Sequence, residues 1–232
     1  IQMKKLKIGV VGVGRGGSMM RYCAVAENAE LVAVCDNWVE GLRQKEKELK
    51  DENITFYESY DEFLNHDMDV GVLANYATEH VPFALKAFEK GLHVFSEVLP
   101  CQTMQEAVQL VEAVERTGLK YAYLENTCYM AGPREMKKLY KQGVLGEFEY
   151  GEGEYCHNCE DIWPKITHGD PAHWRNNMYS TFYCTHSLGP IIHNTHVVEE
   201  LCQKGVSICE TPDETPKGAT LVIRSHGVEK NV

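Results

Sequence analysis

The feature that most restricts the fold is a glycine-rich segment that directly follows a short apolar run near the N-terminus. Leu6–Val11 has the composition of a buried parallel strand, and the next six residues match G-x-G-x-x-G ahead of a helical stretch over about residues 16–27. A strand, a glycine-rich turn and a helix in this order begin a dinucleotide-binding domain. We expect Gly12 to make the tight turn, Gly14 to let the backbone approach a diphosphate, and Gly17 to allow close helix–strand packing.

The same segment predicts the cofactor. A diphosphate would lie at the start of the helix, where free N–H groups and the helix dipole favour an anion, and Arg15 belongs to this predicted site. Asp36 ends the second apolar run and can accept hydrogen bonds from the adenosine ribose, while its charge would repel a 2′-phosphate. The pattern therefore predicts NAD rather than NADP. The alternatives are a glycine-rich turn without a ligand and an ordinary strand-end aspartate.

Short apolar runs alternate with helical stretches through the first 126 residues. The expected strands are 6–11, 31–35, 56–57, 70–74, 93–97 and 121–125, and the expected helices between them include 39–50, 61–64, 79–90 and 103–116. Thr103 and Glu106 form a capping-box pattern, and Gly91 and Gly118 are natural helix stops. Alternation of this kind predicts right-handed crossovers and a parallel sheet. Residues 1–126 are therefore interpreted as an α/β domain with a Rossmann doubly wound parallel sheet.

The pattern changes after residue 126. Arg134–Gln142 has helical spacing, and Glu147–Tyr155 alternates as an antiparallel strand would. From there to about Gly189 the chain is rich in His, Trp, Tyr, Asn and Cys with little periodicity, which is typical of loops that line a site. Residues 127–190 are therefore expected to form an incomplete α+β domain that lines a substrate cleft.

Composition excludes several classes of function. The chain has 23 Lys and Arg against 34 Asp and Glu, so its net charge of −11 argues against a nucleic-acid partner. It has no long uncharged apolar run, so we expect no membrane span. Its nine cysteines are an odd number, several lie in apolar runs, and no secretory signal precedes them, which favours a reducing cytoplasm.

Two further segments carry a resemblance to a known family. Asn75-Tyr76-Ala77-Thr78-Glu79-His80 and Gly91-Leu92-His93-Val94-Phe95-Ser96-Glu97 resemble the Gfo/Idh/MocA oxidoreductases, and the likeness runs from about residue 5 to 191. It implies oxidation or reduction of a sugar or cyclitol by a nicotinamide cofactor, with Asn75, His80 and Glu97 on the cofactor side. The family's usual Glu-Lys-Pro motif is here Glu97-Val98-Leu99-Pro100. Because valine cannot transfer a proton, acid–base work must come from other residues.

Three motifs resemble the branch of this family that contains the NAD-dependent α-N-acetylgalactosaminidases. They are Glu125-Asn126-Thr127-Cys128-Tyr129, Tyr155-Cys156-His157 and the segment from Tyr183 to Pro190. The resemblance implies that Glu125 lies near the nicotinamide ribose. It also implies that the Tyr and His residues line the substrate cleft, and that redox-assisted glycoside hydrolysis is an alternative to simple oxidation.

Hydride loss from a CH–OH carbon requires removal of the hydroxyl proton, for which Tyr and His are suited. We assign this role to Tyr183 and His186, with Tyr155 and His157 completing the catalytic set by positioning the sugar. The loop residues Trp174 and Arg175 are expected to bind substrate, Trp174 by stacking on a sugar face. The alternative for each is an ordinary packed loop side chain.

A metal site is the competing interpretation of the same segment. Cys156 and Cys159 form one C-x-x-C pair, to which Cys184 and His186 would add two ligands. A single pair without a second is a weak signal, and the resemblance explains His186 otherwise. We expect no metal.

The last segment, residues 191–232, resembles a different protein. From Gly189 to Leu201, and again over residues 216–228, the chain is similar to hydroxymethylbutenyl diphosphate reductase. That resemblance implies diphosphate binding by His193 and His226, but the regions that carry the family's iron–sulfur cysteines are lacking. The tail is expected to form a short βαβ-like unit. A natural truncation or fusion and an artificial chimera would all give a join of this kind near residues 188–193.

The sequence thus predicts an NAD-dependent oxidoreductase that acts on a CH–OH group of a small sugar-like or cyclitol substrate. The alternatives are a redox-assisted glycosidase, a dinucleotide-binding protein without turnover, and a diphosphate reductase fragment. Family members pair through the sheet of the second domain, so the resemblance also allows a homo-oligomer.

Overall fold

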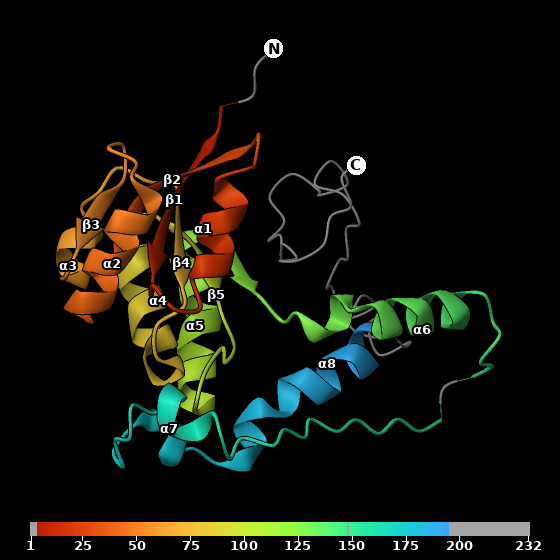
Figure 1. The fold of residues 1–232 in the computed structure, drawn as a ribbon. Coiled ribbons are helices and arrows are strands. Elements are labelled where there is room, and N and C mark those ends of the chain that lie inside the picture. The colour runs from red at the N-terminus through yellow and green to blue at the C-terminus, as the bar shows by residue number, and fades with distance from the viewer. Residues whose placement is uncertain (1–3, 148, 195–232) are drawn as a thin grey trace. The chain divides into compact units, whose positions relative to one another are not determined.

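The computed structural model describes residues 4–147 and 149–194, and the chain divides into two compact units, Ile1–Tyr123 and Leu124–Val232 (Figure 1). The predicted tail is therefore outside the described residues, apart from residues 191–194, and so is His226. The division lies close to the boundary expected at residue 126. Each unit is described on its own below.

The first unit is a six-stranded sheet in which every pair of neighbouring strands is parallel. The strand order is β3-β2-β1-β4-β5-β6, which is the doubly wound Rossmann order and confirms the predicted fold class. The strands are β1 (Leu6–Val11), β2 (Ala29–Cys35), β3 (Thr55–Tyr57), β4 (Val70–Leu73), β5 (His93–Ser96) and β6 (Tyr121–Tyr123).

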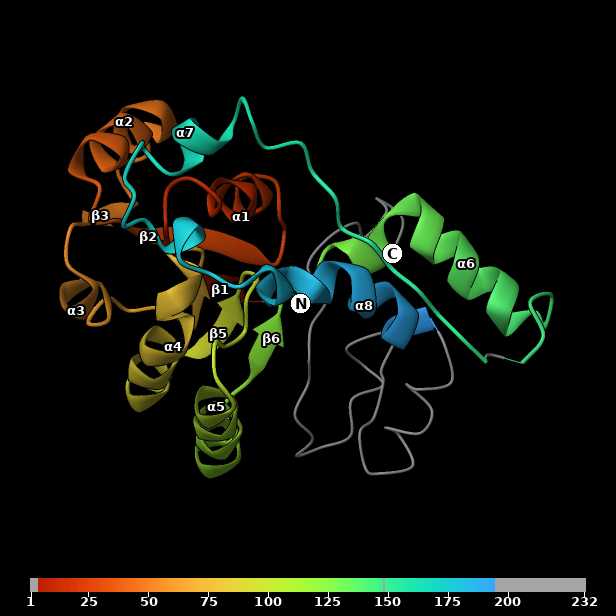
Figure 2. The same ribbon diagram turned by 90° about the horizontal axis from the view of Figure 1, so that it is seen from below.

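Helices cover both faces of this sheet. They are α1 (Gly17–Cys23), α2 (Val39–Leu49), α3 (Tyr60–Phe63), α4 (His80–Glu89), which is preceded by the 3₁₀ turn η1 (Ala77–Glu79), and α5 (Met104–Thr117). Figure 2 shows α1 and α2 on one side of the sheet and α3, α4 and α5 on the other. A parallel sheet needs this arrangement, because both faces of its strands are apolar and must be buried.

Alternate residues of β1 feed two separate hydrophobic cores. Ile8 and Val10 pack with residues of α1 and α2, whereas Val11 belongs to the cluster that α3, α4 and α5 complete. Each such fully buried side chain contributes roughly 1.5–3 kcal/mol to folding. Gly9 lies on the second face, where an added Cβ would come within 2.6 Å of the Phe63 ring. Close packing of Phe63 on β1 therefore requires glycine at this position.

The predicted helix signals of α5 are confirmed. The Thr103 hydroxyl accepts a hydrogen bond from the Glu106 N–H at 3.1 Å, and the Glu106 carboxylate accepts one from the Thr103 N–H at 3.3 Å. The helix ends at Gly118, whose positive φ of 67° is readily adopted by glycine. These two signals fix both ends of the helix that leads into β6.

The second unit contains helices and irregular segments. They are η2 (Thr127–Tyr129), α6 (Ala131–Lys141), α7 (Trp163–Ile166), η3 (Trp174–Asn176), η4 (Ser180–Tyr183) and α8 (Cys184–Asn194). The two longer helices, α6 and α8, lie side by side in both views (Figures 1 and 2). Helix α8 runs through the boundary expected at residue 190.

The antiparallel strand expected at Glu147–Tyr155 does not form. Residue 148 is not described, and the residues on either side of it, 147 and 149–155, have no regular secondary structure. A strand gains its stability from a partner strand, and none of the described residues of this unit supplies one.

No helix in the described part of the chain is both long and apolar enough to cross a bilayer.

Candidate functional site

The glycine-rich loop of the first unit has the geometry of an anion site. Gly12 has a φ of +96°, and a Cβ there would overlap the carbonyl oxygen of Ala74 at the end of β4. Gly14 is exposed, and an added Cβ there would meet nothing within 4 Å. Among the described residues the N–H groups of Gly14 and Arg15 have no hydrogen-bond partner. The loop therefore presents two free backbone donors at the carboxyl edge of the sheet.

The packing role predicted for Gly17 belongs to Gly16 instead. A Cβ on Gly16 would overlap the carbonyl oxygen of Gly12 and the side chain of Val10, whereas one on Gly17 would lie 3.6 Å from an Arg21 nitrogen, an ordinary contact. The prediction was wrong because Gly16, the residue just before α1 begins at Gly17, is the one that faces Gly12 and Val10. Gly17 as a cofactor-binding residue stays a prediction.

Asp36 follows β2 and holds the glycine-rich loop in place. One carboxylate oxygen accepts a hydrogen bond from the Val13 N–H at 2.7 Å, and the other accepts one from the Trp38 N–H at 2.8 Å. A carboxylate has about four acceptor positions, so two remain for ribose hydroxyls. The side chain thus joins the loop after β1 to the start of α2 while it keeps the capacity for the predicted ribose contact.

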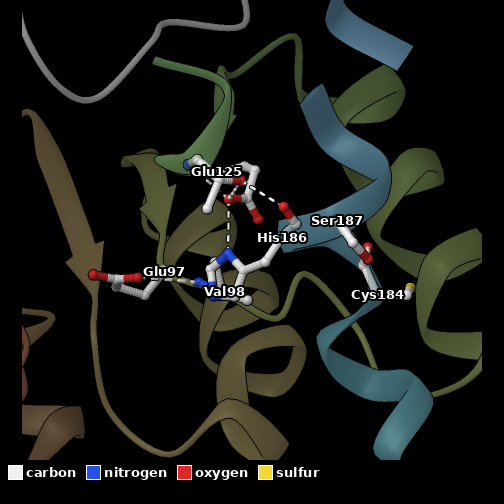
Figure 3. A network of polar contacts seen from close by, with 7 residues as sticks. Glu97, Val98, Glu125, Cys184, His186 and Ser187 are labelled. Atoms are coloured by element: carbon white, nitrogen blue, oxygen red, sulfur yellow. Dashed lines mark hydrogen bonds and ion pairs between the residues drawn. The ribbon is translucent and has the colours of Figure 1, made fainter. Parts of the chain in front are cut away.

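The carboxyl ends of β4 and β5 carry Asn75, His80 and Glu97. The Asn75 amide donates to Glu79 at 3.0 Å, and its buried Oδ1 has no hydrogen-bond partner in the described residues. The Glu97 carboxylate accepts a 3.3 Å hydrogen bond from the Val98 N–H (Figure 3). These two side chains remain available at the edge where parallel sheets bind ligands.

His80 is only 1% exposed, and its contacts lie inside the first unit. Its Nδ1 donates to the Leu99 carbonyl at 2.6 Å, and burial lowers its pKa against the opposing effect of that hydrogen bond. The neutral ring then keeps a lone pair on Nε2, which has no partner in the described chain. His80 positions the Val98–Pro100 segment, and its direct contact with a cofactor stays a prediction.

The second unit brings Glu125 and His186 together although they are far apart in sequence. His186 Nδ1 lies 2.8 Å from Glu125 Oε1, and the two side chains are 10% and 8% exposed (Figure 3). The same oxygen accepts hydrogen bonds from the Thr127 N–H at 3.0 Å and from its hydroxyl at 2.7 Å. The same hydroxyl lies 2.9 Å from the His186 carbonyl oxygen, so its single proton is shared between an acceptor next to η2 and one on α8.

These contacts fix the charge of the carboxylate. Burial alone would raise the pKa of Glu125, but the hydrogen bonds from His186 and Thr127 outweigh it and lower the pKa to about 2. An ionised Glu125 can only accept, so His186 must carry a proton on Nδ1. When this imidazole is neutral its lone pair is therefore on Nε2, which is the arrangement of an oriented general base. Glu125 Oε2 is buried with no partner among the described residues.

The side-chain rings of three predicted catalytic residues lie close to His186 or to one another within this unit. The Tyr155 ring centre lies 4.4 Å from that of His186, 4.5 Å from that of His157 and 6.0 Å from that of Tyr183. The Tyr183 and His186 ring centres are 5.4 Å apart. The structure therefore brings together all four residues that the sequence assigned to the catalytic set.

Arg175 and Trp174 contact the same cluster, but not as expected. Arg175 donates to the Tyr183 hydroxyl oxygen at 2.7 Å, and its guanidinium carbon lies 4.4 Å from the centre of the Trp174 ring. The guanidinium already covers one face of the indole, so stacking on a sugar could use only the other face. Substrate binding by these two residues stays a prediction, while Arg175 also orients Tyr183.

Sequence reasoning missed two residues of this cluster. Thr127 supplies two of the three donors to Glu125, and the only signal for it was a hydroxyl two residues after a carboxylate. The other missed residue is Gly189. A Cβ at this position would lie 3.1 Å from both Glu125 and Cys128. Its small size lets α8 approach η2 closely enough for the hydrogen bond to His186.

The described part of the chain holds no group of three or more His, Cys, Asp or Glu residues placed to bind a metal ion. The cysteines of the competing zinc interpretation, Cys156, Cys159 and Cys184, are free thiols. The structure thus gives that interpretation no support within the described residues.

Comparison with protein families gives two matches. Residues 6–124 match the model of an oxidoreductase family with an NAD-binding Rossmann fold, described as GFO_IDH_MocA, and residues 173–232 match that of the LytB protein. The first match covers the whole parallel sheet. The second begins before η3 and continues into residues that are not described.

Individual relatives agree with the first match. The chain is 31% identical over 202 residues to glycosyl hydrolase family 109 protein 1 of Shewanella sp. (strain MR-4), covering 82% of this chain and 44% of that protein. It is 30% identical, with the same coverage, to an alpha-N-acetylgalactosaminidase of Shewanella oneidensis. Scyllo-inositol dehydrogenase from Lactobacillus casei, solved with NAD(H) and scyllo-inositol, is similar with a TM-score of 0.57 and 26% identity, covering 62% of this chain and 43% of that one. The chain thus spans less than half of the length of these relatives.

Proposed function

The chain belongs to the Gfo/Idh/MocA family of oxidoreductases with an NAD-binding Rossmann fold, and on this premise we propose that it oxidises or reduces a CH–OH group of a sugar or cyclitol with NAD. The observation that carries the proposal is the cluster of Glu125, His186, Tyr155 and Tyr183 in the second unit. It provides an oriented base beside two phenols. Simple packing would not require a buried, ionised carboxylate to hold an imidazole in one tautomer.

The residues present fit a bound dinucleotide. The free N–H groups of Gly14 and Arg15 would hold the diphosphate, and the remaining acceptor positions of Asp36 would hold the adenosine ribose. Glu125 belongs to the second unit, where its Oε2 is a buried oxygen without a partner in the described chain, and its contact with the nicotinamide ribose, which the resemblance implies, stays a prediction. When bound, NAD supplies the hydride acceptor.

The proton of the substrate hydroxyl would be taken by the chain itself. His186 holds its lone pair on Nε2 because Glu125 accepts from Nδ1, so His186 can act as a general base. Tyr183 can relay the same proton, because Arg175 donates to its oxygen and leaves the O–H free to point elsewhere. The guanidinium also places positive charge where negative charge develops as that proton leaves. Val98, in the place of the family's usual lysine, takes no part in proton transfer.

A sugar-like substrate is supported by two relatives and by the aromatic character of the cluster. The similar L. casei enzyme was solved with scyllo-inositol, and the S. oneidensis relative is named for a sugar. Tyr155, which is 44% exposed, and Trp174 offer ring faces of the kind that pack on the C–H faces of a sugar.

The proposal is tested in two steps. Calorimetric titration should show binding of NAD, and weaker binding of NADP, because Asp36 repels a 2′-phosphate. Sugars and cyclitols are then added while the absorbance of the reduced cofactor is followed, with His186→Gln as the variant and His168→Gln as its control. Oxidation that His186→Gln abolishes and His168→Gln preserves supports the proposal. NAD binding without any turnover would indicate a dinucleotide-binding protein that is not an enzyme. No binding of either cofactor would refute the proposal.

Redox-assisted glycoside hydrolysis is a second candidate, favoured by the names of the two Shewanella relatives. In that reaction a sugar hydroxyl is oxidised, the aglycone is eliminated, water adds, and the ketone is reduced again, so the cofactor is unchanged overall. A nitrophenyl α-N-acetylgalactosaminide distinguishes the two reactions. NAD-dependent release of nitrophenol without net formation of reduced cofactor indicates the glycosidase, and net formation of reduced cofactor indicates the dehydrogenase.

A further inference from the structure

Cys156 and Cys159 of the second unit form a C-x-x-C pair that the proposed function does not use. Among the described residues they belong to no group of side chains that could hold a metal ion. Both are free thiols, and Cys156 is exposed while Cys159 is partly buried, so an oxidant in solution can reach the pair. The buried thiols of the first unit differ, because burial raises the pKa of Cys23 to about 11 and that of Cys35 to about 12, which makes them unreactive.

The pair lies within the candidate site. Tyr155 directly precedes Cys156, and His157 lies between the two cysteines. The Tyr155 ring centre is 4.5 Å from that of His157 and 4.4 Å from that of His186. A covalent change at the two thiols therefore acts on side chains that pack against the proposed general base.

The backbone between the two cysteines is open. Residues 151–159 form no helix, strand or turn, and among the described residues no hydrogen bond reaches the backbone of Cys156 or His157. The Cys159 carbonyl, in contrast, accepts a hydrogen bond from the Trp163 N–H at 2.7 Å. One end of the motif is thus held at the start of α7, whereas no backbone hydrogen bond opposes a change of conformation at the other end.

From this arrangement we propose that Cys156 and Cys159 are a reversible disulfide site, and that their oxidation moves His157 away from Tyr155. A disulfide requires the Cα atoms of its two cysteines to lie about 4.4–6.8 Å apart, so a ring closed over only two intervening residues needs a turn at His157 and Asn158. The described backbone makes no turn there, and the contact between the Tyr155 and His157 rings belongs to this open backbone. The reduced and the oxidised pair therefore hold His157 in different positions.

The oxidant is a low-molecular-weight disulfide such as oxidised glutathione. The thiolate of the exposed Cys156 attacks one sulfur of this disulfide, which releases one thiol and leaves a mixed disulfide on Cys156. The Cys159 thiolate then attacks the Cys156 sulfur, which forms the internal bond and releases the second thiol. The chain loses two electrons and two protons, and these convert the oxidant into two thiols. An excess of reduced glutathione reverses both steps.

The consequence for turnover rests on the proposed function. When His157 is displaced, Tyr155 loses a ring neighbour beside His186, so oxidation should lower kcat by roughly 10- to 100-fold. The affinity for NAD should stay constant, because the glycine-rich loop proposed to hold the diphosphate belongs to the first unit.

The disulfide itself is tested on the full chain in buffers with graded ratios of oxidised to reduced glutathione. Remaining thiols are blocked and disulfides are located by peptide mass spectrometry. The variants are Cys156→Ser and Cys159→Ser, and the control is Cys184→Ser, which removes another exposed thiol of the same unit. A bond between Cys156 and Cys159 in the wild type and in the control, which reduced glutathione reverses, supports the proposal. Cys159→Ser should stop at the mixed disulfide on Cys156.

Two results of the mapping overturn the proposal: a bond from Cys156 to Cys184, and mixed disulfides alone in the wild type. The displacement of His157 is followed by the NMR signals of its ring, which are assigned with His157→Gln. These signals should shift when the wild type is oxidised and should stay in place in Cys156→Ser. Unchanged signals in the oxidised wild type would refute the displacement.

Turnover and NAD affinity are measured in the same samples. A fall in kcat in the oxidised wild type that Cys156→Ser does not show connects the disulfide with the proposed reaction, and an unchanged kcat at full oxidation overturns that connection. If none of the proteins turns over a substrate, the proposed function fails, but the mapping and the NMR signals still decide the disulfide site.

Discussion

Replacement of Glu125 by Gln should remove a pH-dependent part of the stability of the second unit. The pKa of Glu125 is lowered from its ordinary value of 4.5 to about 2 in the folded protein. At 1.36 kcal/mol for each pH unit, this difference corresponds to roughly 3 kcal/mol of folding free energy. The contribution is fully present above pH 4.5 and is lost as the pH falls towards 2, because the unfolded chain then takes up a proton that the folded chain excludes.

The assay is urea unfolding at a series of pH values between about 2 and 7, followed by tryptophan fluorescence. The chain has three tryptophans, of which Trp163 and Trp174 belong to the second unit. A Trp38→Phe background therefore reports on the second unit alone. Glu125→Gln in this background should flatten the loss of stability at acidic pH by roughly 3 kcal/mol.

The matched control is Glu135→Gln, which changes an exposed carboxylate on α6 of the same unit. It should leave the pH dependence of the unfolding free energy almost as in the parent. If the parent and Glu125→Gln lose stability in parallel as the pH falls, Glu125 does not hold its charge through His186 and Thr127. The assignment of the His186 tautomer would then fail with it.

Three further predictions concern both units. Gly12→Ala should destabilise the first unit by about 1–3 kcal/mol more than Gly91→Ala in thermal unfolding. Both positions have a positive φ, but only a Cβ at Gly12 would overlap Ala74. Equal losses of stability in the two variants would show that backbone strain alone causes the destabilisation. Thr103→Ala should cost about 1 kcal/mol in the same assay, since α5 loses its capping side chain, and an unchanged midpoint would contradict that role. Tyr183→Phe should lower kcat by roughly 100-fold while NAD affinity, measured by calorimetry, stays constant; an unchanged kcat would remove Tyr183 from proton transfer.

The fold of the first unit could be predicted because its signals are local. The glycine spacing, the Thr103–Glu106 capping pattern and the apolar runs each specify their own segment, and the connection rules for parallel strands then leave few topologies. The position of close packing could not be predicted to the residue. Gly16 and not Gly17 meets β1, because this depends on where α1 begins, and neighbouring glycines look alike in sequence.

The site in the second unit was predictable by residue type but not by partner. Motifs identified Tyr155, Tyr183 and His186, yet no local pattern showed that Glu125 holds His186 across about sixty residues of chain. The strand expected over residues 147–155 does not form, for a related reason. Alternating polarity in one segment is a local signal, but a strand is stable only when a second strand pairs with it, and the segment does not show whether such a partner exists.

The two hydrogen bonds that Asp36 accepts from the Val13 and Trp38 N–H groups limit how this chain can evolve. A single substitution that removed the carboxylate to admit a phosphorylated ribose would also free both backbone donors and loosen the loop that must hold the diphosphate. A change of coenzyme preference would therefore pass through a sequence in which this loop has lost both hydrogen bonds, unless a second mutation first supplied another acceptor. The carboxylate of Asp36, which favours NAD over NADP, is therefore also a structural support of the glycine-rich loop.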